Sequence, residues 1–216
     1  MNIEQARFNM IEQQIRPWDV LDLDVLELLN VVKREDFVPA AYKNLAFVDT
    51  EIPLGGGECM LTPKLEARIL QDVAVKKHEN VLEIGTGSGY MAALLAHKAR
   101  HVTSVEIVPQ LKTLAEQNLA ANGVTNVTVE LGDGAQGWSK GAPYDVIVVS
   151  GSLAVLPEAL LQQVKVGGRI LAIIGEAPIM SAHLITRSSD KAYDTRKLFE
   201  TNVTPLQAVA PSHFQF

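Results

Sequence analysis

A short glycine-rich stretch is the part of this sequence whose residue types and spacing most clearly suggest chemistry. Gly85, Gly87 and Gly89 alternate with Thr86 and Ser88 directly after an apolar run. Glycine adopts backbone conformations that are closed to other residues, and it lets a ligand approach the main chain closely. If a strand precedes the stretch and a helix follows it, the first N–H groups of that helix are also available to the ligand. The stretch therefore predicts a binding turn for a nucleotide-like cofactor.

Two cofactors compete for this turn, and the spacing favours one of them. A dinucleotide site has the pattern G-x-G-x-x-G, in which the last glycine packs helix against strand, but Tyr90 stands at that place here. Glu83, two residues before the first glycine, would oppose a pyrophosphate and attract the ammonium or sulfonium of S-adenosylmethionine. We therefore predict S-adenosylmethionine as the cofactor, and a glycine turn without a ligand is the alternative.

Two acids follow the turn at positions that suit a nucleoside site. Glu106 comes about 20 residues later, where nucleotide-binding α/β folds place an acid that accepts hydrogen bonds from ribose hydroxyls. A cap for the helix that Pro109 begins is the alternative role. Asp133 and Gly134 belong to a Gly-Asp-Gly turn, in which a short acid can accept from an exocyclic amine. For this pair, an ordinary turn is the alternative.

The predicted elements position these residues along one parallel sheet. Strand and helix patterns alternate from about residue 80 to 175, which is typical of βαβ units, and residues 146–149 form the continuous apolar run of a strand buried on both faces. The predicted strands cover 81–84, 101–105, 127–131, 144–149, 169–174, 183–186 and 197–203. The predicted helices cover 3–15, 23–32, 64–73, 90–99, 110–121 and 157–164, and a loop covers 37–63.

Composition sets the class of protein. The chain has 216 residues, 47% of them hydrophobic and 20% charged, which predicts a single globular domain with a sizeable core. A formal net charge of −6 disfavours duplex nucleic acid as the main partner, because phosphate binding needs clustered Lys and Arg. No apolar run is long enough to span a membrane, and the single cysteine, Cys59, permits no intramolecular disulfide.

From these properties we expect a cytoplasmic protein that binds neither nucleic acid nor membranes. The five histidines show no metal-ligand spacing, so no metal site is expected. The oligomeric state is not indicated by the sequence.

Taken together, the motifs resemble the protein-L-isoaspartate O-methyltransferase family from Arg7 to about Leu206. The likeness rests on residues 7–10, 37–39, 81–90, 132–134, 137–138, 142–145 and 160–171. The resemblance implies an α/β, Rossmann-like class I methyltransferase fold, with a mostly parallel sheet, an antiparallel edge strand and a helical N-terminal extension. We expect one domain over residues 1–216, with the helical extension and its loop at 1–75 and the Rossmann-like core at 76–216.

The resemblance also implies roles for single residues around S-adenosylmethionine. Its methionine end would be lined by Glu83, Gly85, Gly87 and Gly89, with Thr86 among the cofactor-binding residues. Glu106 would hold the ribose, Ile107 would pack on the adenine, and Asp133 with Gly134 would bind the adenine edge.

The sequence departs from the family in the loop that is expected to face the reaction. The family loop reads roughly Gly-Gln-Thr-Ile-Ser-Gln-Pro, whereas residues 57–63 here read Gly-Glu-Cys-Met-Leu-Thr-Pro. The hydroxyl implicated in catalysis is replaced by Leu61, which cannot hydrogen-bond, and Thr62 is the neighbouring hydroxyl that could compensate. We predict that residues 55–63 form a lid over the transferred methyl group. Residues 150–154 and the tail at 208–216 also depart from the family.

Three functions stay open at this stage. The first is methylation of a carboxylate of isoaspartyl residues in damaged proteins or peptides, as a repair reaction. A carboxylate is already ionised at pH 7, so this reaction needs alignment and exclusion of water rather than a strong general base. The second is a methyltransferase of the same fold with another acceptor. The third is an S-adenosylmethionine-binding protein that has lost catalysis.

Overall fold

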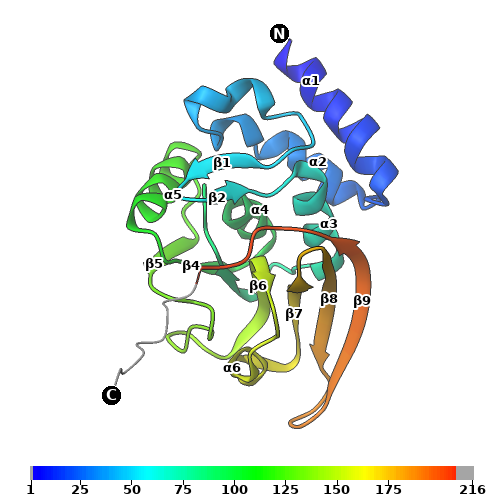
Figure 1. Ribbon diagram of the computed structural model, residues 1–216, viewed down its shortest axis with the longest axis vertical. Helices are drawn as coiled ribbons and strands as arrows, with labels where there is room; N and C mark the ends of the chain where they lie inside the picture. The colour runs from blue at the N-terminus through cyan, green and yellow to red at the C-terminus, as the bar shows by residue number, and fades with distance from the viewer. Residues whose placement is uncertain (1, 208–216) are drawn as a thin grey trace.

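A twisted sheet of seven strands forms the centre of the computed structural model, which describes residues 2–207 (Figure 1). Its strand order is β5-β4-β3-β6-β7-β8-β9. The first five strands in this order pair in parallel, whereas β8 and β9 pair antiparallel at one edge. The strands are β3 (Asn80–Ile84), β4 (His101–Glu106), β5 (Val127–Leu131), β6 (Tyr144–Leu153), β7 (Val164–Glu176), β8 (Ile179–Arg187) and β9 (Tyr193–Thr201). The predicted fold class is confirmed, and its antiparallel edge has two strands.

The apolar runs of the sequence become strands because both faces of the sheet are covered. Val146 and Val148 face one core, Ile147 and Val149 face the other, and all four are fully buried. The first core lies under α2 (Leu23–Val31), α3 (Pro63–Val73), α4 (Tyr90–Lys98) and α5 (Pro109–Ala121). The second lies under α6 (Glu158–Gln163) and the segment around Trp138.

The N-terminal part of the chain is helical, as predicted. It begins with α1 (Ile3–Met10), a π-helical turn η1 (Ile11–Ile15) and a 3-10 turn η2 (Arg16–Trp18). Two further 3-10 turns, η3 (Arg34–Asp36) and η4 (Ala40–Leu45), follow α2. Between these two turns, Phe37 and Val38 are buried in the first core.

The prediction of a loop throughout 37–63 was wrong, because this region contains a β-hairpin. Strands β1 (Ile52–Gly55) and β2 (Glu58–Met60) pair antiparallel. Gly55, Gly56 and Gly57 have φ of 98°, 63° and 89°, so they make a turn that other residues would strain. Ile52 and Met60 face each other in the ladder and are both buried. The strands are short, which is why alternation of apolar residues did not reveal them.

The expected end of the helix before β7 also differs. The helix ends at Gln163, and Gly167 and Gly168 lie inside β7 rather than after the helix. A Cβ on Gly168 would stand 2.6 Å from the carbonyl oxygen of Asp145 on β6, so only glycine leaves room for this approach of the two strands. The pairing of β6 with β7 shifts register at the same place. These glycines therefore serve an irregular strand rather than a helix cap.

After β9 the chain turns back across the ends of the central strands (Figure 1). We call residues 203–207 the C-terminal strap. Pro205 forms a parallel bridge with Ser152 at the end of β6, and the backbone N–H of Leu206 donates to the carbonyl of Ser152 at 3.0 Å. The departing tail at 208–216 lies outside the described residues. Between residues 2 and 207, no helix is long and apolar enough to cross a membrane.

Candidate active site

The glycine turn connects β3 to α4 with three left-handed glycines. Gly85, Gly87 and Gly89 have φ of 91°, 54° and 86°. A Cβ on Gly89 would lie 3.3 Å from Ala115 in α5, so the third glycine lets the helices α4 and α5 pack closely. Gly85 and Gly87, by contrast, line an open pocket at the carboxyl ends of β3 and β4. Two glycines of the motif therefore line the pocket, and the third serves packing.

The pocket brings together about half of the residues predicted for the site. Six of them line it: Leu61, Gly85, Gly87, Glu106, Ile107 and Gly134. Five others lie outside this lining: Thr62, Glu83, Thr86, Gly89 and Asp133.

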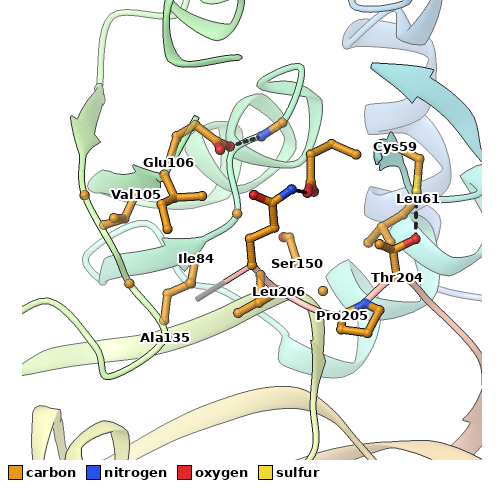
Figure 2. Close-up of a pocket in the computed structure, with 18 residues that line it drawn as sticks. Cys59, Leu61, Ile84, Val105, Glu106, Ala135, Ser150, Thr204, Pro205 and Leu206 are labelled. Atoms are coloured by element: carbon orange, nitrogen blue, oxygen red, sulfur yellow. Dashed lines mark hydrogen bonds between the residues drawn. The ribbon is translucent and has the colours of Figure 1, made fainter. Parts of the chain in front are cut away.

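Glu106 is the most strongly positioned of the lining residues (Figure 2). It ends β4 and is only 4% exposed. Its Oε2 accepts a hydrogen bond from the backbone N–H of Gly87 at 2.8 Å, and its Oε1 accepts one from Val108 N–H at 2.9 Å. Each carboxylate oxygen can accept about two hydrogen bonds, so both keep capacity for a ligand. The acid that follows the turn is thus locked to the turn itself.

A narrow apolar slot lies beside Glu106. Ile84 and Val105 line it from the strand ends, and Gly134 lies against them. A Cβ on Gly134 would stand 2.9 Å from Ile84 and 3.3 Å from Val105, so only glycine leaves room there. The carboxylate of Asp133 accepts from the backbone N–H of Ala135 at 2.8 Å, which fixes the turn that carries Gly134. The shape suits a flat ring held between apolar side chains.

Glu83 lies behind the wall of the pocket rather than in it. Its side chain is fully buried, and it accepts hydrogen bonds from the hydroxyls of Ser104 at 2.6 Å and Ser150 at 3.1 Å. The Thr86 hydroxyl is 2.6 Å from that of Ser104 and extends the network. Burial, only partly offset by the two hydroxyl donors, raises the pKa of Glu83 to about 8. Ser150 lines the pocket, so Glu83 is one hydrogen bond away from a ligand.

Two segments outside the sheet also line the pocket. The hairpin contributes Glu58 and Cys59, and the C-terminal strap contributes Thr204 and Leu206. Figure 2 shows Cys59 facing Thr204 across the pocket edge. The two segments touch, since the Cys59 thiol lies 3.4 Å from the Thr204 hydroxyl. A Cβ on Gly85 would lie 3.2 Å from Leu206, which therefore lies directly over the first glycine of the turn.

Some lining residues were not predicted as site residues. Ser150 follows the apolar run of β6, and the rule that ligands bind at the carboxyl ends of parallel strands could have identified it. Thr204 and Leu206 come after an antiparallel strand, and no sequence pattern indicates that this segment returns to the pocket.

A second cavity adjoins the first across the strap. It encloses about 660 Å³ and is lined partly by Thr62, Ser152, Met180 and Asn202. Thr62 therefore lines this cavity, whereas its neighbour Leu61 lines the first pocket. The two cavities share Thr204 and Pro205 in their lining.

The charges of the described lining are of one sign. Glu58 and Glu106 line the first pocket, Glu51 and Glu176 line the second, and no Lys, Arg or His from residues 2–207 lines either. Burial and the nearby charge of Glu106 raise the pKa of Glu58. In this part of the chain, no group of three or more His, Cys, Asp or Glu is placed to hold a metal ion.

A glycine turn, an acid at the end of the second parallel strand and a slot beside it define a Rossmann-like class I methyltransferase fold with its pocket at the switch of strand order. The family model for protein-L-isoaspartate(D-aspartate) O-methyltransferase matches residues 5–209. The chain belongs to this family.

Individual relatives agree with this assignment. A protein-L-isoaspartate O-methyltransferase 2 of Marinobacter nauticus is 37% identical over 206 residues, which cover 95% of this chain and 94% of the relative. A protein-L-isoaspartate O-methyltransferase of Methanoculleus marisnigri is 41% identical over 171 residues, which cover 79% and 78%. A Plasmodium falciparum protein assigned to the same class, crystallised with S-adenosyl-L-homocysteine, superposes with a TM-score of 0.81 at 19% identity and covers 96% of this chain and 99% of its own.

Proposed function

We propose that this protein is an S-adenosylmethionine-dependent methyltransferase that methylates the carboxylate of isoaspartyl residues in proteins or peptides. The observation that carries the proposal is membership of the family over nearly the whole chain, joined to a pocket built around Glu106 and the glycine turn.

The pocket fits the nucleoside part of S-adenosylmethionine. Glu106 faces it with lone pairs to spare and is held by Gly87, so it is suited to accept from the two ribose hydroxyls. Ile84, Val105 and Ile107 offer the apolar surfaces for an adenine, and Gly134 leaves room for its plane. A direct contact of Asp133 with the adenine edge stays a prediction.

The methionine part would occupy the region of Gly85, Ser150 and Leu206. Glu83 acts there through Ser150 rather than by touching the ligand. When bound, S-adenosylmethionine supplies a methyl group to a carboxylate oxygen, so that an O–C bond forms while the S–C bond breaks and its electron pair stays on sulfur.

The chain itself provides alignment and a dry site rather than a base. The hairpin and the strap cover the pocket and touch each other, which limits access of water to the reacting atoms. The role of residues 55–63 as a lid over the methyl group remains a prediction that agrees with this placement.

A second candidate function is methylation of another acceptor on the same fold. It is favoured by Leu61, which lines the pocket at 6% exposure and presents no hydrogen-bonding group there.

The test compares two synthetic peptides that differ only in isoaspartate against aspartate. With labelled S-adenosylmethionine, we expect base-labile label on the isoaspartyl peptide alone. No label on either peptide, with S-adenosylhomocysteine still bound in calorimetry, would favour another acceptor.

A variant links this activity to the pocket. Glu106→Gln removes the charge and turns an amide N–H toward a backbone N–H, so we expect S-adenosylhomocysteine to bind about 10- to 100-fold more weakly. Glu130→Gln is the matched control, since Glu130 is an acid of the neighbouring strand β5 that pairs with Lys140 outside the pocket. Equal affinities of the two variants would refute the assignment of Glu106.

A further inference from the structure

We propose that the hydroxyl of Thr204, at the wall between the two cavities, binds and orients the acceptor carboxylate. The proposal rests on the proposed function and assigns a specific residue to its acceptor side.

The position of Thr204 follows from the geometry of the transfer. A displacement at the methyl carbon needs the incoming oxygen on the side opposite to the sulfur, so the acceptor requires its own approach to the donor pocket. The second cavity provides that approach, because it is large, open and separated from the first pocket by the strap. Thr204 and Pro205 line both cavities, and of these two only Thr204 has a polar side chain.

The chemistry of the lining leaves few groups that could orient a carboxylate. No Lys, Arg or His from the described residues lines either cavity, so the donor must be neutral. Ser150 already donates to Glu83, and the Ser152 hydroxyl donates to the carbonyl of Val203 at 3.2 Å. Thr62 and Asn202 line the second cavity but not the donor pocket. Gln207 lines the donor pocket, and its side-chain amide already donates to Glu58.

The Thr204 hydroxyl has a weaker hydrogen bond than the two serine hydroxyls, so it can exchange its partner more easily. Its contact is with the Cys59 thiol at 3.4 Å, and sulfur is a poor hydrogen-bonding partner, so exchange for a carboxylate oxygen is favourable. Burial raises the pKa of Cys59, which keeps the thiol neutral beside an incoming anion. The proposed contact therefore replaces a weak hydrogen bond with a charge-assisted one.

The backbone of Thr204 is fixed, as orientation requires. Its carbonyl accepts from the Ser152 N–H at 3.1 Å, and two residues later Leu206 N–H donates back to Ser152 at 3.0 Å. The strap is thus hydrogen-bonded to the end of β6, and the hydroxyl is held where the hairpin meets the strap (Figure 2).

The test uses Thr204→Val, which keeps the shape and removes the hydroxyl, and Thr204→Ser, which keeps the hydroxyl. With the isoaspartyl peptide, we expect Thr204→Val to lower kcat/KM by about 10- to 100-fold, as for a lost hydrogen bond to a charged group. Thr204→Ser is expected to stay within a few-fold of wild type. The affinity for S-adenosylhomocysteine, measured by calorimetry, should be unchanged in both. Thr195→Val, on the exposed side of β9, is the matched control.

The outcomes separate this inference from the function on which it rests. An active wild type with an equally active Thr204→Val variant overturns the role of Thr204 and leaves the proposed function intact. Loss of S-adenosylhomocysteine affinity in step with activity also overturns it, because Thr204 would then serve the donor pocket. Loss of activity in Thr62→Val but not in Thr204→Val assigns the acceptor contact to Thr62 instead. A wild type that methylates neither peptide refutes both proposals.

Discussion

Among single residues, the buried carboxyl of Glu83 is the one from which we predict a dependence of stability on pH. It is fully buried, and its two described donors are serine hydroxyls. Because its pKa is raised to about 8, the folded protein holds this side chain largely protonated at neutral pH. The unfolded chain ionises it at an ordinary pKa near 4.5. The folded state therefore binds the extra proton between these two values.

This difference predicts how stability depends on pH. The contribution of Glu83 is fully present below about pH 4.5, declines as pH rises, and is lost once pH passes about 8. Within that window, its slope approaches about 1.4 kcal/mol per pH unit. Glu83→Gln mimics the protonated form, so we expect its free energy of unfolding to vary less between pH 5.5 and 8.5 than that of wild type, as measured in urea.

The exposed acid Glu158 provides the control for this measurement. Glu158→Gln should follow the wild-type profile. Parallel profiles for Glu83→Gln and wild type would contradict the raised pKa of Glu83.

At the scale of elements, Arg34 connects three segments beneath the pocket. It lies in η3, is 1% exposed, and pairs with Glu66 of α3. Its Nη2 donates to the carbonyl of Leu61 at 2.8 Å, and the guanidinium lies 5.3 Å from the ring centre of Tyr90 in α4. Through this hydrogen bond, the N-terminal part of the chain holds Leu61, which follows β2 and lines the pocket.

Removal of one partner of this pair should be costly. Arg34→Met leaves the Glu66 carboxyl buried without its cation, and we expect a loss of about 3–5 kcal/mol in the free energy of unfolding. The double variant Arg34→Met, Glu66→Leu removes both groups and should be more stable than Arg34→Met alone.

Urea unfolding of the single and double variants measures this coupling. Arg16→Met, which removes an exposed ion pair with Glu12, is the surface control and should change stability by less than about 1 kcal/mol. If the double variant is no more stable than Arg34→Met, the unpaired Glu66 carboxyl is not the cause of the lost stability.

The same elements show what the sequence could and could not predict. The alternation of apolar runs identified β3 to β7 because buried parallel strands need continuous hydrophobicity. The hairpin was missed because β2 has only three residues, Glu58–Met60, which are too few to show an alternation of apolar and polar side chains. Glu106 was identified from its spacing to the turn, and the structure places it in the pocket. The strap was missed because its place depends on hydrogen bonds to Ser152, a contact between distant parts of the chain.

At the scale of the whole molecule, charge is distributed unevenly between the protein and its cavities. The chain has 19 Lys and Arg against 25 Asp and Glu, yet none of these basic side chains from the described residues lines the two cavities. Glu58 and Glu106 lie close enough in the first pocket for their charges to interact. We therefore expect a negative potential in the pocket, because no basic side chain of the described lining neutralises these acids.

Salt should reveal this potential. S-adenosylmethionine has a permanent sulfonium charge, so we expect its affinity in calorimetry to fall by about threefold or more between 0.05 and 0.5 M NaCl. Glu58→Gln should reduce that dependence. An affinity independent of salt, in wild type and variant alike, would contradict a role for the acidic lining.

The acidic lining also has a consequence for how a turnover ends. Transfer of the methyl group would turn the sulfonium into an uncharged thioether. The product, S-adenosylhomocysteine, therefore lacks the positive charge that the acidic lining favours. On charge alone, we expect the acidic lining to favour S-adenosylhomocysteine less than S-adenosylmethionine. Another molecule of S-adenosylmethionine, which is positively charged, would then compete for the pocket with an electrostatic advantage, and this advantage favours replacement of the product by the next donor.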